Sequence, residues 1–197
     1  MTGTTDRPPR VRRTAEDRRR QLIGIGLEML TTMAFHQVTV DEVARRAGIS
    51  RSLLFHYFPT KRDYYAAVVR AAARRLLRAT VPLEGAEPAD RLRATVDAYV
   101  AFIRRRREAY VSVFRAPRQD EWILEIHEET QNALSHKVFE ALGIDSPEET
   151  LVLAVRAWWA FAEHLCVDWT ARRDGGDEEL AAMLVDTLTD VVRRAAV

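Results

Sequence analysis

The sequence predicts an all-α protein with a three-helix N-terminal head and a C-terminal helical body, about nine helices in total. Two observations predict this class. Apolar residues recur three and four positions apart through most of the 197 residues, which is the spacing of one side of a helix. Ser or Thr precedes an acidic residue by three positions at several expected helix starts, and glycine or proline follows several expected helix ends. We expect a flexible basic arm over 1–13, a head over 14–62 and a body over 63–197.

The head is expected to begin with a helix that Thr14 and Asp17 cap. Its apolar stripe runs from Leu22 to Met33 and would pack on the helices that follow. The arm before it carries arginines together with two adjacent prolines that block regular structure. This arm either reaches along a polyanion or is a tail with no fixed role.

Residues 39–61 predict two short helices joined by a tight turn, the arrangement of a helix-turn-helix. Thr39 can cap the first helix, with Glu42 reaching back to complete a capping box. Gly48 ends this helix because glycine tolerates the left-handed conformation that the turn needs. Ser50 can cap the second helix, one side of which then faces outward.

Pro59 stops the second helix, and Thr60 with Asp63 begins a further one. Lys61 therefore lies at a helix N-terminus, where a cation is unfavourable for the helix dipole. This position makes sense if a phosphate approaches the same backbone N–H groups. The charge distribution agrees: residues 1–62 hold 12 basic and 6 acidic residues, a net +6, and the remainder holds 18 and 23, a net −5. A solvated charged surface is the alternative explanation of that asymmetry.

The same stretch resembles the DNA-binding motif of the TetR family of bacterial transcriptional regulators, whose pattern runs approximately T-x-x-x-I-A-x-x-A-G-V-S-x-G-T-L-Y-x-H/Y-F-x-x-K. The resemblance spans 15–65. The matching positions are Thr39, Val43, Ala44, Ala47, Gly48, Ile49, Ser50, Leu54, Tyr57, Phe58 and Lys61. Ser52, Leu53 and Phe55 depart from the pattern, so Phe55 has no hydroxyl to offer a phosphate and no relative's operator sequence transfers to this chain.

Double-stranded DNA is therefore the expected partner of the head. Arg51 can bond a guanine edge and Leu53 can touch a thymine methyl, contacts that read sequence. The other polar side chains are expected on phosphates, which position a protein without specifying sequence. The complete set of expected DNA-contacting residues is Thr39, Ser50, Arg51, Ser52, Leu53, His56, Tyr57 and Lys61.

The body is expected to contain four helices before its last pair. Their predicted ranges are 60–81, 92–107, 108–115 and 122–142, with Gly143 ending the last of them. The arginines at 104–107 are expected in solvent near a helix C-terminus, where they favour the dipole. A second contact with nucleic acid is the alternative for this run.

The last two helices are expected to pair with a second copy of the chain. Ser146, Pro147 and Glu149 predict the start of the first, which runs to about Arg173 and is apolar nearly all round. Such a helix must be buried nearly all round. In a small body this is best explained by a homodimer with a four-helix interface, which the resemblance also implies. The expected interface residues are Leu151, Val155, Trp158, Leu165, Trp169, Leu184, Leu188 and Val191.

The resemblance also implies an effector pocket in the body, whose occupancy releases DNA. A mostly apolar or aromatic effector with one polar or anionic group would fit such a pocket. Aromatic residues at helical spacing are otherwise core, and Arg156 and Glu163 either pair with neighbours or across the dimer, or contact the effector. The expected lining residues are Tyr99, Phe102, Tyr110, Phe114, Trp122, Arg156, Trp159 and Glu163.

Other classes of protein find less support. His127 and Glu128, followed by Gln131, fall one histidine short of the zinc motif H-E-x-x-H. Neither a phosphate-binding glycine loop nor a nucleophile elbow is present. We expect no enzyme, no metal site and no cofactor. A single cysteine, Cys166, excludes an internal disulfide; it is either a buried inert thiol or a redox sensor.

A cytoplasmic location is expected because no signal peptide and no apolar run of about 20 residues is found. The resemblance favours a repressor over an activator. The remaining alternative is a helical protein-interaction module without sequence-specific DNA binding. That module would leave the basic head and Lys61 unexplained.

Overall fold

The computed structural model describes residues 14–81, 85–115 and 120–195. Within these ranges the chain forms eight α-helices, one 3-10 helix and no strand, which confirms the predicted all-α class. The elements are α1 (Ala15–Met29), η1 (Phe35–Gln37), α2 (Val40–Ala47), α3 (Arg51–Tyr57), α4 (Lys61–Ala79), α5 (Pro88–Phe114), α6 (Glu121–Leu142), α7 (Glu149–Arg172) and α8 (Asp177–Ala195). The arm predicted over 1–13 lies outside the described residues.

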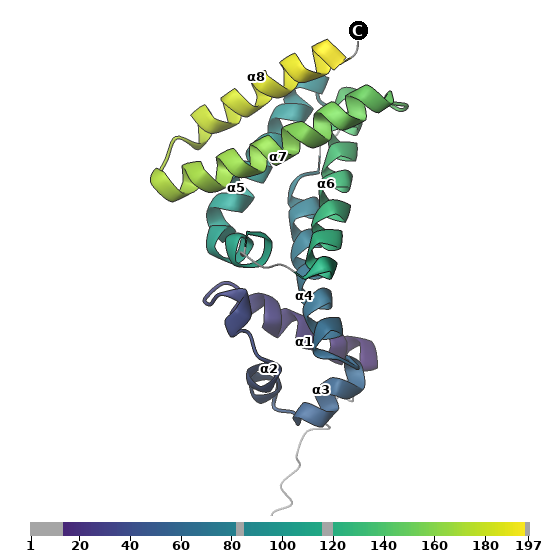
Figure 1. Ribbon diagram of the computed structural model, residues 1–197, viewed down its shortest axis with the longest axis vertical. Coiled ribbons are helices and arrows are strands. Elements are labelled where there is room, and N and C mark those ends of the chain that lie inside the picture. The colour runs from purple at the N-terminus through teal and green to yellow at the C-terminus, as the bar shows by residue number, and fades with distance from the viewer. Residues whose placement is uncertain (1–13, 82–84, 116–119, 196–197) are drawn as a thin grey trace, which may run out of the picture.

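The head lies at one end of the molecule, where α1, α2 and α3 gather and α4 leads away into the body (Figure 1). Close packing of α1 on α4 depends on Gly26, because a Cβ there would lie 2.5 Å from Oη of Tyr64 and 2.7 Å from Cγ2 of Val68. The Tyr64 hydroxyl donates to the carbonyl of Leu22 at 2.9 Å. The head therefore rests on the first turns of α4.

The capping boxes predicted at the starts of α1 and α4 are complete, whereas the box predicted at α2 is only half formed. The Thr39 hydroxyl accepts the N–H of Glu42 at 3.2 Å, as expected. The Glu42 carboxylate instead accepts from Arg45 and Arg46 at 2.6–2.7 Å. Charge-assisted bonds to two guanidinium groups are stronger than one bond to a backbone N–H, which explains the difference.

The turn between α2 and α3 has the geometry that the sequence predicts. Gly48 adopts φ 65° and ψ 38°, the left-handed conformation. This conformation lets the N–H of Ile49 donate to the carbonyl of Ala44 at 3.0 Å. The Ser50 hydroxyl then caps α3 by accepting the N–H of Leu53 at 3.1 Å. These bonds fix the direction in which α3 leaves α2.

About nine helices were predicted, whereas the described residues form eight α-helices and one 3-10 helix. The short helix expected over 108–115 is the last part of α5, which kinks at Arg106 (φ −131°, ψ 21°) but continues to Phe114. The additional element is η1, which the sequence did not suggest. Its first residue, Phe35, donates its N–H to the hydroxyl of Ser112 at 3.2 Å, so η1 joins the head to α5.

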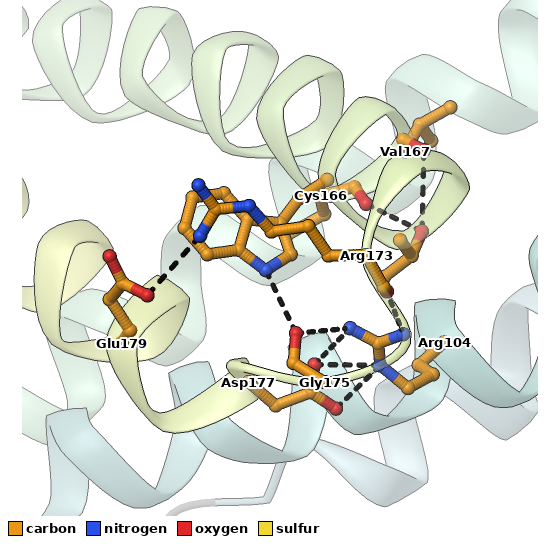
Figure 2. A network of polar contacts seen from close by, with 9 residues as sticks. Arg104, Cys166, Val167, Arg173, Gly175, Asp177 and Glu179 are labelled. Carbon is orange, nitrogen blue, oxygen red and sulfur yellow. Dashed lines mark hydrogen bonds and ion pairs between the residues drawn. The ribbon is translucent and has the colours of Figure 1, made fainter.

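The arginines at 104–107 are not all in solvent, contrary to the prediction. Figure 2 shows Arg104 reaching from α5 to the turn between α7 and α8, where its Nε donates to the Asp177 carboxylate at 2.6 Å. Its other nitrogens donate to the carbonyls of Arg173 at 2.8 Å and Gly175 at 3.2 Å. Because α5 continues past this run, there is no helix C-terminus here, and Arg104 instead anchors the α7–α8 turn.

The start of α7 also differs from the prediction. The N-cap is Glu148, without a side-chain cap, rather than Ser146. Glu148 has an extended backbone (φ −68°, ψ 155°), so the helix begins at Glu149, two residues later than a start at Pro147. By length and composition α7 is apolar enough to cross a membrane, but its packing against α5, α6 and α8 accounts for that character.

Candidate nucleic-acid interface and ligand pocket

The exposed side of α3 carries most of the residues predicted to contact DNA. Leu54 and Phe58 are buried in the head core and hold α3 in place. Because helical residues four apart share one side, the remaining side chains turn outward. Arg51, Ser52, Leu53 and His56 are exposed and Tyr57 is half-buried. The structure thus brings these residues together on one surface.

Three predicted phosphate contacts surround this surface. Thr39 and Ser50 are exposed, and their hydroxyl oxygens accept backbone N–H bonds at the starts of α2 and α3. A hydroxyl that accepts one bond can still donate its proton to a phosphate. Lys61 is the first residue of α4 and is exposed. At that helix start the N–H groups and the lysine charge both favour an anion.

Arg51 is held on the surface by contacts that the sequence did not reveal. Its guanidinium donates to the Asp41 carboxylate at 3.0 Å and lies 5.5 Å from the centre of the Phe55 ring. To contact a base, Arg51 must exchange Asp41 for that base. Because both partners are exposed, the pair is screened by water and the exchange is inexpensive.

Positive charge is available at the start of α4, whereas the charge of the α2 arginines is partly compensated. The bonds from Arg45 and Arg46 lower the pKa of the Glu42 carboxyl to about 2, so Glu42 stays anionic and offsets one of these two positive charges. Within the part of the chain that the structure describes, Lys61 and Arg62 have no acidic partner. Their charge is therefore available to a polyanion.

A pocket lies between the head and the body, bounded by α1, α4, α5 and α6. The volume of this cavity is about 60 Å³. A drug-sized ligand would therefore have to widen it. The lining residues are Leu27, Leu30, Thr31, Val69, Ala72, Ala73, Arg75, Leu76, Phe102, Arg106, Ala109, Tyr110, Val113, Phe114, His127, Thr130, Gln131 and Leu134.

Three of the eight predicted effector residues, Phe102, Tyr110 and Phe114, line this pocket. The other aromatic ones, Tyr99, Trp122 and Trp159, are buried in the core and do not line it. Tyr99 lies one turn before Phe102 on α5, Trp122 lies five residues before His127 on α6, and Trp159 belongs to α7, none of whose residues lines the pocket. Sequence spacing alone does not say which helices, or which part of a helix, border a cavity. Tyr99 and Trp159 pack edge to face, with ring centres 4.9 Å apart.

The two charged effector candidates lie outside the pocket, although they share α7. Arg156 is exposed and pairs with Glu128 at 3.0 Å, so it is a surface residue. Glu163 is only 4% exposed. Its carboxylate lies 2.9 Å from Nε2 of His127 and accepts from Gln131 at 3.0 Å. Because His127 and Gln131 line the pocket, the Glu163 carboxylate is connected to it through these two side chains.

The sequence missed several lining residues. His127 and Gln131 were noticed only as parts of an incomplete zinc motif, and the described residues contain no group of three or more side chains that could hold a metal. Their spacing of four, continued by Leu134 three positions later, marks one side of α6 and could have indicated a shared surface. For Arg75 and Arg106, no spacing in the sequence indicated that they would line a pocket.

Most residues predicted for a dimer interface lie inside a single chain. Leu151, Val155, Trp158, Leu184 and Leu188 are buried, so a partner subunit cannot reach their side chains. Leu165, Trp169 and Val191 are partly exposed. Their burial follows from α7 and α8 packing on α5 within one chain. The dimer interface itself stays a prediction. Apolar side chains that α7 and α8 do expose are Leu153 (58%), Phe161 (44%) and Met183 (39%).

Comparison with known proteins connects this geometry to a family. The model of a family described as "Bacterial regulatory proteins, tetR family" matches residues 24–68, which cover the end of α1 through the first turns of α4. A tetR-family transcriptional regulator from Streptomyces coelicolor has a crystal structure that superposes with a TM-score of 0.77 at 26% identity, covering 93% of this chain and 90% of that one.

Curated relatives are similar over shorter stretches. The HTH-type transcriptional activator FasR of Mycolicibacterium smegmatis is 28% identical over 143 residues, or 66% of this chain and 61% of that protein. The HTH-type transcriptional regulator BetI of Escherichia coli is 42% identical over 53 residues, or 27% of each protein. The chain thus spans less than two thirds of the length of either relative.

Proposed function

Since the chain belongs to the TetR family of bacterial regulatory proteins, we propose that it is a ligand-responsive repressor that binds an inverted-repeat operator as a homodimer. A small, largely apolar effector releases it from DNA. It acts in the cytoplasm as a regulator rather than as an enzyme.

The observation that carries this proposal is the exposed surface of α3 with the start of α4. Arg51 and Leu53 project from α3, and Lys61 lies where α4 begins. Base-reading side chains on one helix, with a cation and free N–H groups beside it, suit a helix in the major groove flanked by phosphate contacts. The left-handed turn at Gly48 sets the angle between α2 and α3 that this docking needs.

Dimerisation is proposed through the exposed sides of α7 and α8. Leu153, Phe161 and Met183 offer apolar surface there that a second copy would cover. In a two-fold dimer the two α3 helices meet equivalent half-sites, roughly 34–36 Å or a multiple of it apart. The operator is therefore expected to be an inverted repeat.

Effector response is proposed through the pocket, because its walls come from both the head and the body. Leu27 of α1 and Leu30 and Thr31, which directly follow this helix, belong to the head, and Tyr110 and Gln131 belong to α5 and α6 of the body. A ligand that widens this narrow pocket must move α1 relative to α5 and α6. Because α1 packs on α2 and α3, such a movement changes the position of α3 and favours release from DNA.

A gel-shift experiment tests binding and release together. The protein is mixed with DNA that flanks its own coding region and with random competitor DNA at moderate ionic strength. We expect a specific complex that candidate effectors dissociate. Equal affinity for every fragment and for the competitor would contradict the proposal.

The direction of regulation needs a separate measurement, because the relative FasR is named an activator. Deletion of the gene should raise the transcripts of the operator's genes if the protein represses them. A fall in those transcripts would show activation.

A further inference from the structure

Two arginines line the end of the pocket that lies away from the head. Arg75 comes from α4 and Arg106 from the kink in α5. Among the described residues neither has a carboxylate partner, and Arg106 lies over the Phe102 ring at 4.8 Å from its centre. Burial, followed by the nearby charges of Arg105 and Arg75, lowers the pKa of the Arg106 guanidinium. Positive charge is thus gathered here without compensation.

The position of these arginines along the pocket follows from helix geometry. Arg75 lies six residues beyond Val69 on α4, or about 9 Å further from the head at 1.5 Å per residue. Arg106 precedes Phe114 by eight residues, or about 12 Å along α5. Arg75 is exposed, so this end borders solvent. The opposite end is closed by α1.

Between the two ends the wall is almost entirely apolar. The apolar lining residues of the stretch are Val69, Ala72, Ala73, Leu76, Phe102, Ala109, Val113 and Leu134. Because the space is so narrow, a slender chain enters with less displacement of the helices than a broad ring system. The apolar part of such a ligand would contact the apolar wall along its whole length. A charged group at one end of the ligand would then lie at the solvent-bordered end of the pocket, beside Arg75 and Arg106.

The polar group midway along the pocket does not suit an anion. His127 and Gln131 already bond the buried carboxylate of Glu163 at 2.9 and 3.0 Å. Arg115, whose guanidinium lies 4.0 Å from the same carboxylate, does not line the pocket. A second negative charge on the pocket side of Glu163 would be repelled in a poorly solvated site. An anionic group is therefore directed to Arg75 and Arg106.

We propose that the effector is an anionic amphiphile whose carboxylate or phosphate lies between Arg75 and Arg106 and whose single apolar chain runs toward Leu27 and Leu30 at the end of α1. This inference rests on the proposed function for its regulatory meaning. The head group fixes the ligand at the mouth, and the chain transmits its presence to the head. Chains too short to reach α1 bind without releasing DNA.

Calorimetry on the full chain without DNA tests the ligand class. The probes are decanoate, decyl phosphate, decanol and decylammonium, below their aggregation concentrations. The variants are Arg75→Gln and Arg106→Gln, and the matched controls are Arg74→Gln and Arg105→Gln, which remove the same charge from exposed neighbours outside the pocket. Circular dichroism establishes that each variant is folded. Arg75 is exposed, so its variant remains informative if the Arg106 variant does not fold.

We expect one or both anions to bind more tightly than decanol, and decylammonium to bind least. Each pocket variant should weaken anion binding about tenfold, the size of a partly exposed charge-assisted bond, and leave decanol unchanged. The controls should weaken anion binding much less than the pocket variants do, because Arg74 and Arg105 do not line the pocket. The preferred anion then identifies the head group.

The proposal is overturned if neither anion binds, if decanol or decylammonium binds as tightly, or if the pocket variants match the controls. In a gel shift, hexanoate should leave the DNA complex intact at saturation while decanoate dissociates it. Equal effects of the two would overturn the role of the chain. Specific anion binding by a protein that ignores DNA would instead refute the proposed function and leave the ligand class standing.

Discussion

At the scale of single residues, Lys61 and Arg51 are expected to contribute differently to DNA binding. Lys61→Ala removes a phosphate contact, so affinity should fall evenly across sequences and the salt slope should decrease by about 1. Arg51→Ala should lower affinity about tenfold for the preferred sequence and much less for others. Titrations against an operator and its single-base variants, at several salt concentrations, measure both effects.

Arg74→Ala is the control for Lys61, since Arg74 is an exposed residue of the same helix and lies beyond the head. It should leave the salt slope unchanged. If the Lys61 and Arg51 variants behaved alike, the assignment of one to phosphates and the other to bases would be refuted.

Cys166 should make the stability of the protein depend on alkaline pH. Burial, the largest cause, raises the pKa of its thiol from 9.0 to about 12. The unfolded chain releases this proton near pH 9 and the folded chain does not. The stabilisation is complete below pH 9 and is lost as pH rises toward 12, at about 1.4 kcal/mol per pH unit.

Urea unfolding over this pH range, compared with Cys166→Ala, measures the effect. Buried Tyr99 and Tyr110 also have raised pKa values and add a slope of the same sign in both proteins. Only the difference between the two slopes reports on Cys166. Parallel slopes, or rapid labelling of the native thiol by a maleimide, would show that the thiol is not protected.

At the scale of elements, the two-helix unit of the head depends on the backbone at Gly48. A Cβ at Gly48 would meet no atom within 4 Å, and the same is true of Gly24 inside α1. Packing is therefore equal at the two sites, and only the backbone differs. Gly48→Ala should destabilise the protein by about 1–2 kcal/mol, because its φ is +65°. Gly24→Ala should stabilise it by about 1 kcal/mol.

Thermal or urea unfolding of the two variants measures this contrast. Changes of the same sign would mean that the α2–α3 turn does not require the left-handed conformation. The stabilised Gly24→Ala protein should keep its DNA affinity, whereas a rearranged turn in Gly48→Ala should reduce it.

At the scale of the whole molecule, the oligomeric state should depend on the exposed side of α7. Phe161→Arg places a charge in the proposed interface and should convert a dimer into a monomer at micromolar concentration in sedimentation experiments. Leu124→Arg is the matched control, because Leu124 is similarly exposed but lies on α6. A dimer that tolerated the first substitution and not the second would place the interface elsewhere.

The parts of the fold that the sequence predicted are those held by contacts of short range. The caps at Thr14, Ser50 and Thr60 and the turn at Gly48 each involve residues no more than five apart. Even there, the Glu42 carboxylate accepts hydrogen bonds from Arg45 and Arg46 and not from the backbone N–H of Thr39, which the capping box predicted. Several donors lie within one turn of Glu42, and the sequence does not say which of them it bonds.

Sequence by itself determined the helical class, the order of the helices, the helix-turn-helix and the outward side of α3, since spacing and capping act within one or two turns. Tertiary structure decided which residues face the pocket and which side of α7 faces outward. Phe102 lines the pocket and Tyr99, one turn earlier, does not. Arg104 anchors a turn 73 positions away, at Asp177. These outcomes depend on how distant helices rotate and pack against one another, and a periodic pattern along one helix does not contain that information.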